Sequence, residues 1–595
     1  MLKAIFLLCS TGLVVVNCEN VYKIVKTKSG PIRGLVQKTL WYEEEYYSFR
    51  GIPYAKPPVG GLRFKAPEPF EVWTDPFDAF RYGRMCSQIQ RDSLTTSENC
   101  LFLNIFTPDT TGRGKLPVIF VIHGGLYAAG SGDDSRWGPD FFIENDVIVV
   151  TINYRLGAMG FMSLGSSDYS GNMGMKDQQL ALKWIHDNID AFGGDNNRIT
   201  ICGISAGSKS IGFHLFNKES SKNFNQILGI SGVANAAQAY QKGDHKCLMR
   251  IFFQKHNSRC PHSDDELIEF LQNVDVDKII KFTEETIHCQ ASPWNPIVEK
   301  SDAKSPFLLE DPEQLLKHAQ SINKTAYFTF ARYEQLYFTG GTNYTDPKDI
   351  EELLRDFFIT LPIFGYSSII AKKPYLRDLM DEVRSFYFGK ATTEDEVFKQ
   401  RLIMDSDIHY VYFIEKWLEQ HVAVSHQKTF YQRFSAYTKI NERNFRHGKY
   451  HIGSHADENC YAFRCRAITN LYKEIMEKKD IDVQSAIAFR ILHNMQKLFS
   501  NFVTYGNPIH NGNPTKNFLP LMLNKASMFN FVDVTNDGLS AGIAPNANRS
   551  KFIDYVVNEV KRLVEIHGDT PSKTPIQQMC DEMLESTSTE TCSLS

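Results

Sequence analysis

The chain has 595 residues, of which 42% are hydrophobic and 23% are charged. This composition supports a sizeable buried core and argues against a disordered chain. The formal net charge of -4 at pH 7, without a long basic block, argues against nucleic acid as a partner, because phosphate binding needs clustered lysine and arginine.

The first 18 residues have the pattern of a secretory signal peptide. Lys3 is followed by an apolar run that extends to Val16, and the residues at positions 16–18 fit a cleavage point. No other stretch of the sequence reaches eighteen apolar residues, so we expect no membrane span and a secreted, extracellular protein. A retained signal anchor is the alternative interpretation.

Residues 19–566 are predicted to form one large domain, because no linker-like stretch divides them. Within it, residues 237–310 and 348–420 are helix-rich and irregular, and we interpret them as cap insertions over the sheet edge at which substrates bind. Residues 567–595 are polar and rich in serine, threonine and glutamate, which predicts a flexible C-terminal tail.

Strands and helices alternate in the predicted core. Apolar runs at residues 118–122 and 147–152 indicate buried strands, and apolar residues recur at helical spacing between residues 173 and 189. A Gly-Gly-Asp break at 193–195 precedes another strand, at 199–202. This order predicts an α/β protein with a mostly parallel central sheet and helices on both faces.

A serine between two glycines follows that last strand directly. The stretch from Gly203 to Gly207, with Ser205 at its centre, has the pattern of a nucleophile elbow. The strand must turn sharply into a helix there, and the glycines remove side chains that would collide, so the hydroxyl of Ser205 is left exposed at the sheet edge. An esterase is the leading hypothesis, although any Gly-rich turn with a serine has the same pattern.

A serine nucleophile needs a base to take its proton and an acid to orient that base. In α/β hydrolases the three groups follow in the order serine, acid, histidine. Glu334, after an apolar strand-like run, and His455, beside an acidic pair, satisfy this order. From the pattern alone, a solvated carboxylate at a strand end and a surface histidine are the alternatives.

Backbone amides must also stabilise the charge that develops on the substrate carbonyl oxygen. One donor is expected from Ala206, at the N-terminus of the helix after Ser205. The others are expected from Gly125 and Leu126, in a Gly-rich loop after the strand at 118–122. An ordinary glycine turn is the alternative, but this loop stands in the expected order before the elbow.

Several long motifs give the chain a family resemblance. They are the segment from Gly171 to Gly207 and shorter stretches at 49–55, 97–101, 153–155 and 501–508. The sequence resembles type-B carboxylesterases, the family of cholinesterases, animal carboxylesterases and insect juvenile hormone esterases, and it is most like the secreted insect members. The resemblance covers nearly the whole mature chain except the tail. It implies an α/β-hydrolase fold, hydrolysis of carboxylic esters, and no metal or cofactor.

The resemblance also implies a role for each candidate residue. Ser205 would be the nucleophile, Glu334 the acid and His455 the general base. Ser231 would support the acid and the histidine from behind. The implied oxyanion donors are the backbone amides of Gly125, Leu126 and Ala206.

Cysteine usage agrees with export. Cys9 and Cys18 would leave with the signal peptide, and the other ten cysteines predict disulfides in an oxidising compartment. Cys202, in the strand before the elbow, is interpreted as a buried free thiol. Spacing suggests two short bridges that also match the family, Cys86 with Cys100 and Cys247 with Cys260. The sequence leaves open the pairing of Cys289, Cys460, Cys465, Cys580 and Cys592. Glycosylation sequons begin at Asn323, Asn343 and Asn548.

Four residues depart from the family pattern. Ile204 stands where most relatives have a polar residue, commonly glutamate, so we expect a less polar acyl-binding environment. Leu126 stands where many relatives have glycine or alanine, and its side chain would crowd one wall of the site. Gln335 and Ala456 replace glycines that follow the acid and the histidine, which bears on the rate more than on the mechanism.

Cholinesterase activity is disfavoured. The loop between Cys86 and Cys100 has thirteen residues and no tryptophan, whereas cholinesterases use a longer loop that supplies an aromatic face for choline. Juvenile hormone esterases usually have glutamine at the position of Ile204, so the sequence does not support that specific role. We therefore expect a secreted serine hydrolase of small, fairly apolar carboxylic esters. A catalytically silent adhesion or binding protein, or a scavenger that acylates but deacylates slowly, is the alternative, and the oligomeric state is left open.

Overall fold

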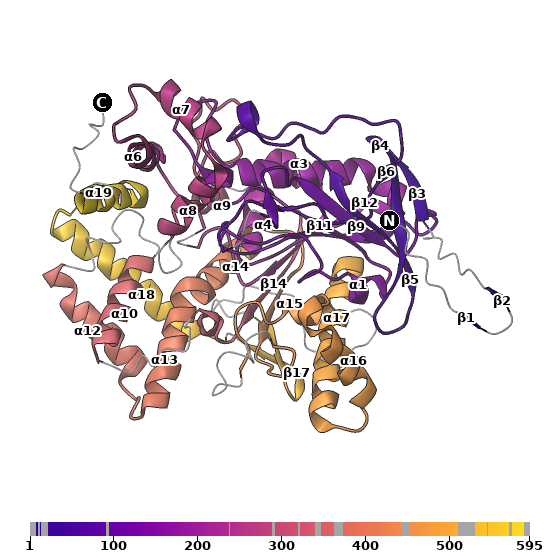
Figure 1. Ribbon diagram of the computed structural model, residues 1–595. Helices are drawn as coiled ribbons and strands as arrows, with labels where there is room; N and C mark the ends of the chain where they lie inside the picture. Colours follow the sequence, from indigo (N-terminus) through magenta and orange to yellow (C-terminus); the bar gives the residue numbers. More distant parts are fainter. Residues whose placement is uncertain are drawn as a thin grey trace.

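The computed structural model describes most of the chain. The described residues are 8–9, 12–13, 22–90, 94–236, 239–287, 292–318, 322–338, 347–361, 373–441, 452–509, 530–543, 545–569 and 574–587. Figure 1 shows one twisted sheet with helices above and below it, and a further group of helices beside it.

The sheet has 13 strands in the order β17-β16-β15-β14-β13-β12-β10-β11-β9-β5-β4-β3, with β6 paired to β4. The centre, from β11 and β10 through β12 to β16, is parallel, and both flanks are antiparallel. The strands are β3 (Tyr22–Thr27), β4 (Gly30–Lys38), β5 (Glu45–Pro53), β6 (Phe77–Asp78), β9 (Phe102–Thr107), β10 (Leu116–Ile122), β11 (Ile148–Ile152), β12 (Gly194–Ile204), β13 (Gln226–Ile230), β14 (Thr325–Ala331), β15 (Thr429–Phe434), β16 (Asn530–Thr535) and β17 (Gly538–Ile543).

The apolar runs at 118–122, 147–152 and 199–202 fall in β10, β11 and β12, as predicted. Nearly all their side chains are buried because both faces of a parallel sheet are covered. In β10, Val118 and Phe120 pack into one apolar cluster, whereas Ile119 and Val121 pack into another on the opposite face. The core therefore lies on both sides of the sheet.

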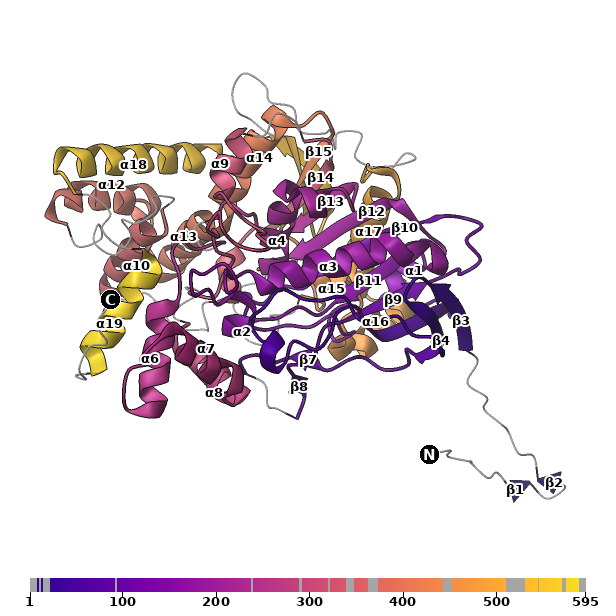
Figure 2. The same cartoon turned by 90° about the horizontal axis from the view of Figure 1, so that it is seen from above.

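Helices cover each face. The predicted helix at 173–189 is present as α3 (Met173–Asn188), which lies with α4 (Ala206–Phe216) on one face. The other face carries α1 (Asp140–Ile143), α15 (Asn459–Ala462), α16 (Thr469–Lys478) and α17 (Val483–Tyr505) (Figures 1 and 2). Shorter elements are β1 (Leu8–Cys9), β2 (Gly12–Leu13), β7 (Met85–Cys86), β8 (Thr96–Ser97), α2 (Gly157–Phe161), α5 (Lys218–Ser221) and α9 (Pro312–His318).

The two segments interpreted as cap insertions are helical. They form a group at the end of the molecule far from β3 and β4, where the last helices of the chain join them (Figure 2). The helices of this group are α6 (Lys246–Asn257), α7 (Asp264–Asn273), α8 (Val276–Glu285), α10 (Pro347–Thr360), α12 (Arg377–Phe388), α13 (Glu394–Ser406), α14 (Tyr412–Val424), α18 (Ala547–Ile566) and α19 (Pro575–Thr587).

One of the two predicted disulfides is confirmed and the other is wrong. Cys86 pairs with Cys100, but Cys247 pairs with Cys580 rather than with Cys260. Cys247 lies in the first turn of α6 and Cys260 lies beyond its last turn, so about 15 Å of helix separates the two ends. Cys260 forms a disulfide of its own.

A third bridge joins Cys460 to Cys465, a pair that the sequence left open. Cys202 is a buried free thiol, as predicted, and its burial raises its pKa far above the usual range.

The predicted flexible tail is also partly wrong. Residues 575–587 form α19, which the Cys247–Cys580 bridge ties to α6. Ile576 and Cys580 on this helix are buried in the main apolar cluster. A polar composition did not reveal this helix because few apolar side chains, on one face, are enough to bury it.

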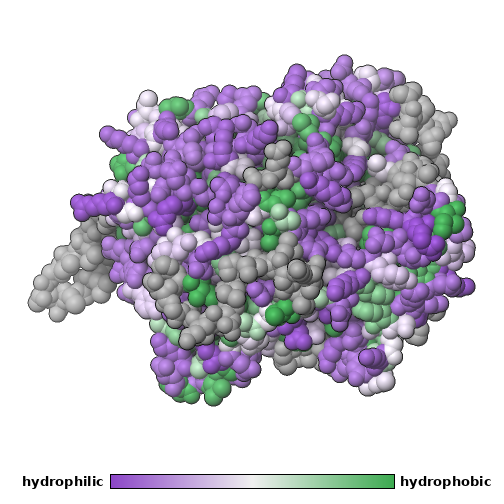
Figure 3. All heavy atoms as spheres, turned by 180° about the vertical axis from the view of Figure 1, so that it is seen from behind, coloured by the Kyte–Doolittle hydropathy of each residue, from purple (hydrophilic) through white to green (hydrophobic). Residues whose placement is uncertain are grey.

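The face of the molecule seen from behind is mostly hydrophilic where its residues are described (Figure 3). On this face, hydrophobic residues occur in small groups between hydrophilic ones (Figure 3). None of the helices in the described ranges is both long enough and apolar enough to cross a membrane. Asn323 and Asn548 are exposed, whereas Asn343 lies outside the described residues, so glycosylation stays a prediction.

Candidate active site

Ser205 occupies a sharp turn between β12 and α4. Its backbone has φ 56° and ψ -121°, which is unusual for a residue with a side chain, and its amide donates to the carbonyl of Ile230 at 2.8 Å. A methyl group on Gly203 would lie 2.3 Å from the carbonyl of Gly207, and one on Gly207 would lie 2.1 Å from the carbonyl oxygen of Ile122. Both glycines are therefore required by close backbone contacts.

Glu334 and His455 form a buried pair. Glu334 begins the short helix η3 (Glu334–Tyr337), directly after β14, and His455 follows β15. The Nδ1 atom of His455 lies 2.5 Å from Oε2 of Glu334, and the two side chains are almost fully buried. A backbone bridge between Tyr333 and Ser454 holds the two segments side by side.

The carboxylate of Glu334 is fixed from behind. Its Oε1 atom accepts hydrogen bonds from the hydroxyl of Ser231 and from the amide of Ala331, both at 2.7 Å. Ser231 follows β13, and the preceding residue, Ile230, accepts the amide hydrogen of Ser205. The end of β13 thus connects the serine turn to the acid–histidine pair. Within the described chain no hydrogen bond joins the hydroxyl of Ser205 to the ring of His455.

The Gly-rich loop after β10 packs directly against the serine turn. A methyl group on Gly124 would lie 3.0 Å from the Cβ atom of Ser205 and 2.6 Å from the carbonyl oxygen of Ile204. Gly125 has φ 113°, and a methyl group there would lie 2.0 Å from the carbonyl oxygen of Ala129. The loop therefore can approach Ser205 only with glycines at these two positions.

Three backbone amides near Ser205 are available to a ligand. Across the described ranges, no acceptor binds the amide hydrogens of Gly125, Leu126 and Ala206. The amide of Ala206 lies at the N-terminus of α4, where the helix dipole favours negative charge. The side chain of Leu126 is only partly buried.

Three aromatic rings lie around the imidazole of His455. The rings of Tyr337, Phe338 and Tyr410 lie 5.6, 5.3 and 4.8 Å from the His455 ring, measured between centroids. Ile204, next to Ser205 in the chain, is buried in the apolar cluster that also contains Ala456. The imidazole thus has apolar neighbours, whereas the carboxylate of Glu334 is bound by polar groups.

Glu458 is a second buried acid that the sequence argument missed. It accepts a hydrogen bond from the hydroxyl of Thr329 at 3.3 Å, and its side chain has no exposed surface. Burial, and then the nearby charge of Glu334, raise the pKa of Glu458 well above its usual range. The sequence signal for Glu458 was the acidic pair at positions 457 and 458, shortly after His455. The other member of this pair, Asp457, accepts hydrogen bonds from the backbone amide and the hydroxyl of Ser454.

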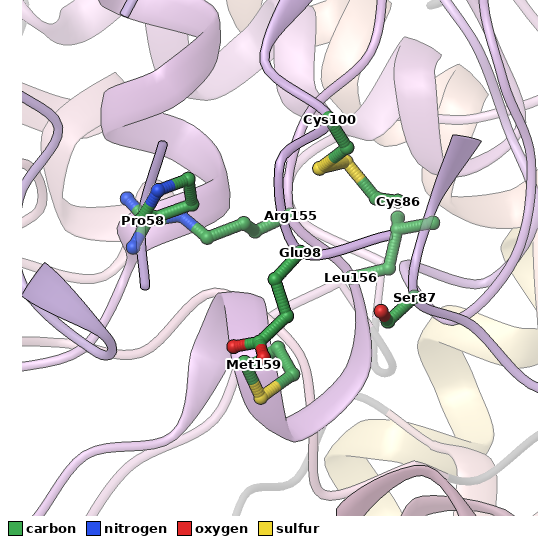
Figure 4. Close-up of a pocket in the computed structure, with 8 residues that line it drawn as sticks. All are labelled: Pro58, Cys86, Ser87, Glu98, Cys100, Arg155, Leu156 and Met159. Atoms are coloured by element: carbon green, nitrogen blue, oxygen red, sulfur yellow. A yellow bond between two sulfur atoms is a disulfide. The ribbon is translucent and has the colours of Figure 1, made fainter. Parts of the chain in front are cut away.

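A small pocket beside the Cys86–Cys100 bridge is separate from these residues (Figure 4). Two of its polar side chains are already paired: Glu98 with Arg63 at 2.6 Å, and Arg155 with Asp177 at 2.7 Å. Its lining residues are Pro58, Cys86, Ser87, Glu98, Cys100, Arg155, Leu156 and Met159. The paired charges indicate a structural role.

Most of the chain matches known proteins. The model of the carboxylesterase family matches residues 21–551. The chain is 30% identical over 567 residues to a juvenile hormone esterase of Tribolium castaneum, covering 90% of this chain and 93% of the relative. It is 30% identical to esterase FE4 of Myzus persicae, covering 86% of this chain and 89% of that one.

A solved structure has the same fold. It is the juvenile hormone esterase of Manduca sexta with OTFP covalently attached, which aligns with a TM-score of 0.75 and 24% identity over 90% of this chain and all of that one. The predicted α/β-hydrolase fold is thereby confirmed. The match over most of the chain shows that the protein belongs to the carboxylesterase family and is a carboxylic-ester hydrolase.

Proposed function

We propose that the protein is a secreted serine hydrolase that cleaves carboxylic esters through an acyl-enzyme on Ser205. The observation that carries the proposal is the buried contact of 2.5 Å between His455 Nδ1 and Glu334. A proton on Nδ1 that is held by a carboxylate leaves Nε2 as the ring atom that can accept the serine proton. Disulfides in the described chain support an oxidising compartment and hence secretion.

The mechanism has two stages. His455 takes the proton of Ser205 as the hydroxyl attacks the ester carbonyl, and the amides of Gly125, Leu126 and Ala206 stabilise the oxyanion. His455 then donates the proton to the departing alcohol, and water that it activates releases the acid from Ser205. The Ser205–His455 hydrogen bond forms when substrate binds, since such catalytic contacts are often loose in an empty enzyme.

The surroundings favour a substrate that is largely apolar. Ile204 carries no charge beside the nucleophile, and three aromatic rings surround His455. A small ester with an apolar chain therefore fits this environment better than a choline ester, whose cation needs a negative charge or an exposed aromatic face.

Replacement of Ser205 by alanine tests the proposal. Turnover of 4-nitrophenyl butyrate should fall at least about 10⁴-fold, because loss of a triad serine removes the covalent route. Ser208→Ala is the matched control. The buried hydroxyl of Ser208 donates to the carbonyl of Gly232 at 2.6 Å, and its loss should leave the labelling of Ser205 by a fluorophosphonate intact.

Labelling with a fluorophosphonate separates the alternatives. An active site with this mechanism becomes phosphonylated on Ser205, whereas a silent binding protein does not. A scavenger would be labelled but would release one burst of nitrophenol and then turn over slowly. Undiminished turnover in Ser205→Ala would contradict the proposal.

A further inference from the structure

Lys209 lies in α4, one helical turn after Ser205. Its amide donates to the carbonyl of Ser205 at 2.9 Å, and only 8% of the residue is exposed. A methyl group on Gly232 would lie 3.4 Å from Cγ of Lys209 and 2.7 Å from the carbonyl oxygen of Ser205, so both residues pack on the same glycine. This lysine therefore packs beside the serine turn.

The direction of the helix sets where the side chain extends. Side chains of an α-helix tilt toward its N-terminus and cover the preceding turn, and residues four apart share a face. Because the N-terminus of α4 is the serine turn, the aliphatic part of Lys209 extends back along the helix toward Ser205. Figure 2 shows α4 at the boundary between the sheet and the group of cap helices.

His409 lies close enough to Lys209 for its pKa to respond to the charge of the lysine. It belongs to η5 (Asp407–Val411), in the same turn as Tyr410, whose ring lies 4.8 Å from that of His455. Burial, and then the charge of Lys209, lower the pKa of His409 to about 4, so this imidazole is neutral at physiological pH. Histidine has no anionic form at these pH values, so His409 cannot balance the charge of the lysine.

The ammonium of Lys209 has no partner among the described residues. No hydrogen bond or ion pair to Nζ is found in the described chain. Lys176 on α3 is equally buried but forms an ion pair with Glu299 at 2.7 Å and further bonds to Ser170 and to the carbonyl of Gly171. An unpaired buried charge is costly, and burial lowers the pKa of Lys209 to about 8.

We propose that Lys209 determines substrate specificity by binding a negatively charged group, a carboxylate, of the ester whose carbonyl is attacked by Ser205. This inference rests on the proposed function, because it concerns the same site. A carboxylate that enters with the substrate supplies the missing partner in a charge-assisted hydrogen bond. The substrate then has an apolar chain, as Ile204 and the rings around His455 favour, and an anionic end. The carboxylate can belong to the acid or to the alcohol part of the ester.

Two matched pairs of chromogenic esters test this inference. The first pair, 4-nitrophenyl hydrogen glutarate and 4-nitrophenyl methyl glutarate, differs by a carboxylate in the acid part. The second pair, 3-butyryloxy-4-nitrobenzoic acid and its methyl ester, differs by a carboxylate in the alcohol part. The measured quantity is the ratio of kcat/KM for the anionic ester to that for the neutral one, divided by the same ratio for hydrolysis by hydroxide.

Lys209→Met should lower this ratio at least tenfold for one of the two pairs, and Lys209→Arg should preserve most of it. Lys324→Met is the control, since it removes a partly buried lysine just before β14, at the ends of the strands opposite to Ser205. Its ratios should stay within twofold of wild type. Equal ratios in wild type and Lys209→Met for both pairs would overturn the inference.

The wild-type enzyme alone also provides a test if Lys209→Met does not fold. A corrected ratio below one for both pairs would show that the site rejects the carboxylate, and the inference would be wrong. Hydrolysis of the neutral esters separates this result from failure of the proposed function. If wild type hydrolyses neither neutral ester, the proposed function fails; if it hydrolyses them without preference for the anion, only the inference fails.

Discussion

Two buried glutamates with different hydrogen-bond partners lie at the centre of the site. Glu334 accepts three polar contacts, from His455, Ser231 and Ala331, whereas Glu458 accepts one long bond from Thr329. Burial, and then the nearby charge of Glu334, raise the pKa of Glu458 and favour its neutral form. The carboxyl beside the histidine is thus held by several hydrogen bonds, whereas burial favours the neutral form of the second carboxyl.

Glu458→Gln should keep kcat for a neutral 4-nitrophenyl ester within about threefold of wild type at pH 7. Glutamine has the shape of a protonated glutamate and is likewise uncharged. Glu334→Gln is the comparison, and it should lower kcat by about 10⁴-fold because the wrong tautomer of histidine is then favoured. A loss of more than tenfold in Glu458→Gln would mean that Glu458 is ionised and contributes its charge.

Ser231→Ala tests the support behind Glu334. The variant loses a hydrogen bond of 2.7 Å to a buried carboxylate, which is worth about 1.5 to 3 kcal/mol. We expect kcat to fall about tenfold with little change in KM, because the histidine is held less firmly while substrate contacts remain. Steady-state kinetics of Ser208→Ala, whose hydroxyl binds a backbone carbonyl instead, give the control. Equal kcat losses in the two variants would point to a general packing effect.

Sequence patterns predicted which residues the structure brings together here, but they did not predict the burial and pKa shifts of the acids and the lysine around them. Gly203 and Gly125 could be read from the sequence because backbone contacts leave no room for a side chain there. Ala456 has φ 69°, a left-handed conformation that explains why relatives have glycine at this position. Glu458 and Lys209 could not be assigned in advance, because burial and missing partners depend on elements distant in sequence.

At the scale of elements, α13 carries a buried acid near its end. Burial raises the pKa of Asp405 to about 7, although Arg401 lies 3.6 Å away and opposes the shift. The folded state binds this proton more tightly than the unfolded state does, whose aspartate has a pKa of about 3.9. The stability that Asp405 contributes is thus full below pH 4 and is lost as the pH rises toward 7.

Asp405→Asn should therefore raise the free energy of unfolding more at pH 8 than at pH 5. The gain is at most about 4 kcal/mol, the free-energy equivalent of the pKa shift. Urea unfolding at both pH values measures it, with Asp395→Asn, an exposed change on the same helix, as the control. A pH-independent difference between Asp405→Asn and wild type would contradict the expectation.

Some elements of the fold could be predicted from the sequence and others could not. The strands β10, β11 and β12 are continuous apolar runs, since parallel strands are covered on both faces, and such runs are visible in sequence. The helix α19 has a weaker pattern and was assigned to a flexible tail. The pairing of Cys247 was wrong for a related reason: its partner lies 333 residues away, and spacing only suggests short loops.

For the whole molecule, the Cys247–Cys580 bridge closes the longest of the described disulfide loops. Replacing both cysteines by alanine should lower the free energy of unfolding by about 2 to 5 kcal/mol, because the unfolded chain gains conformational freedom. The double change at Cys460 and Cys465, whose bridge spans a separation of 5 residues, should cost less.

Hydrogen exchange provides a second measurement on the same variants. Amides of α19 should exchange faster in the Cys247/Cys580 variant, whereas those of α17 should keep their protection. Unchanged exchange in α19 would show that apolar packing alone holds this helix.

The positions of α18 and α19 bear on where a recombinant clone of this chain should end. The family match stops at residue 551, inside α18, whose remaining turns carry buried valines and an isoleucine. A clone that ends there would expose an apolar stripe and leave Cys247 without its partner, so a free thiol would replace the bridge. A boundary drawn from family similarity would therefore cut through a folded part of this enzyme, and recombinant material should extend at least to Thr587.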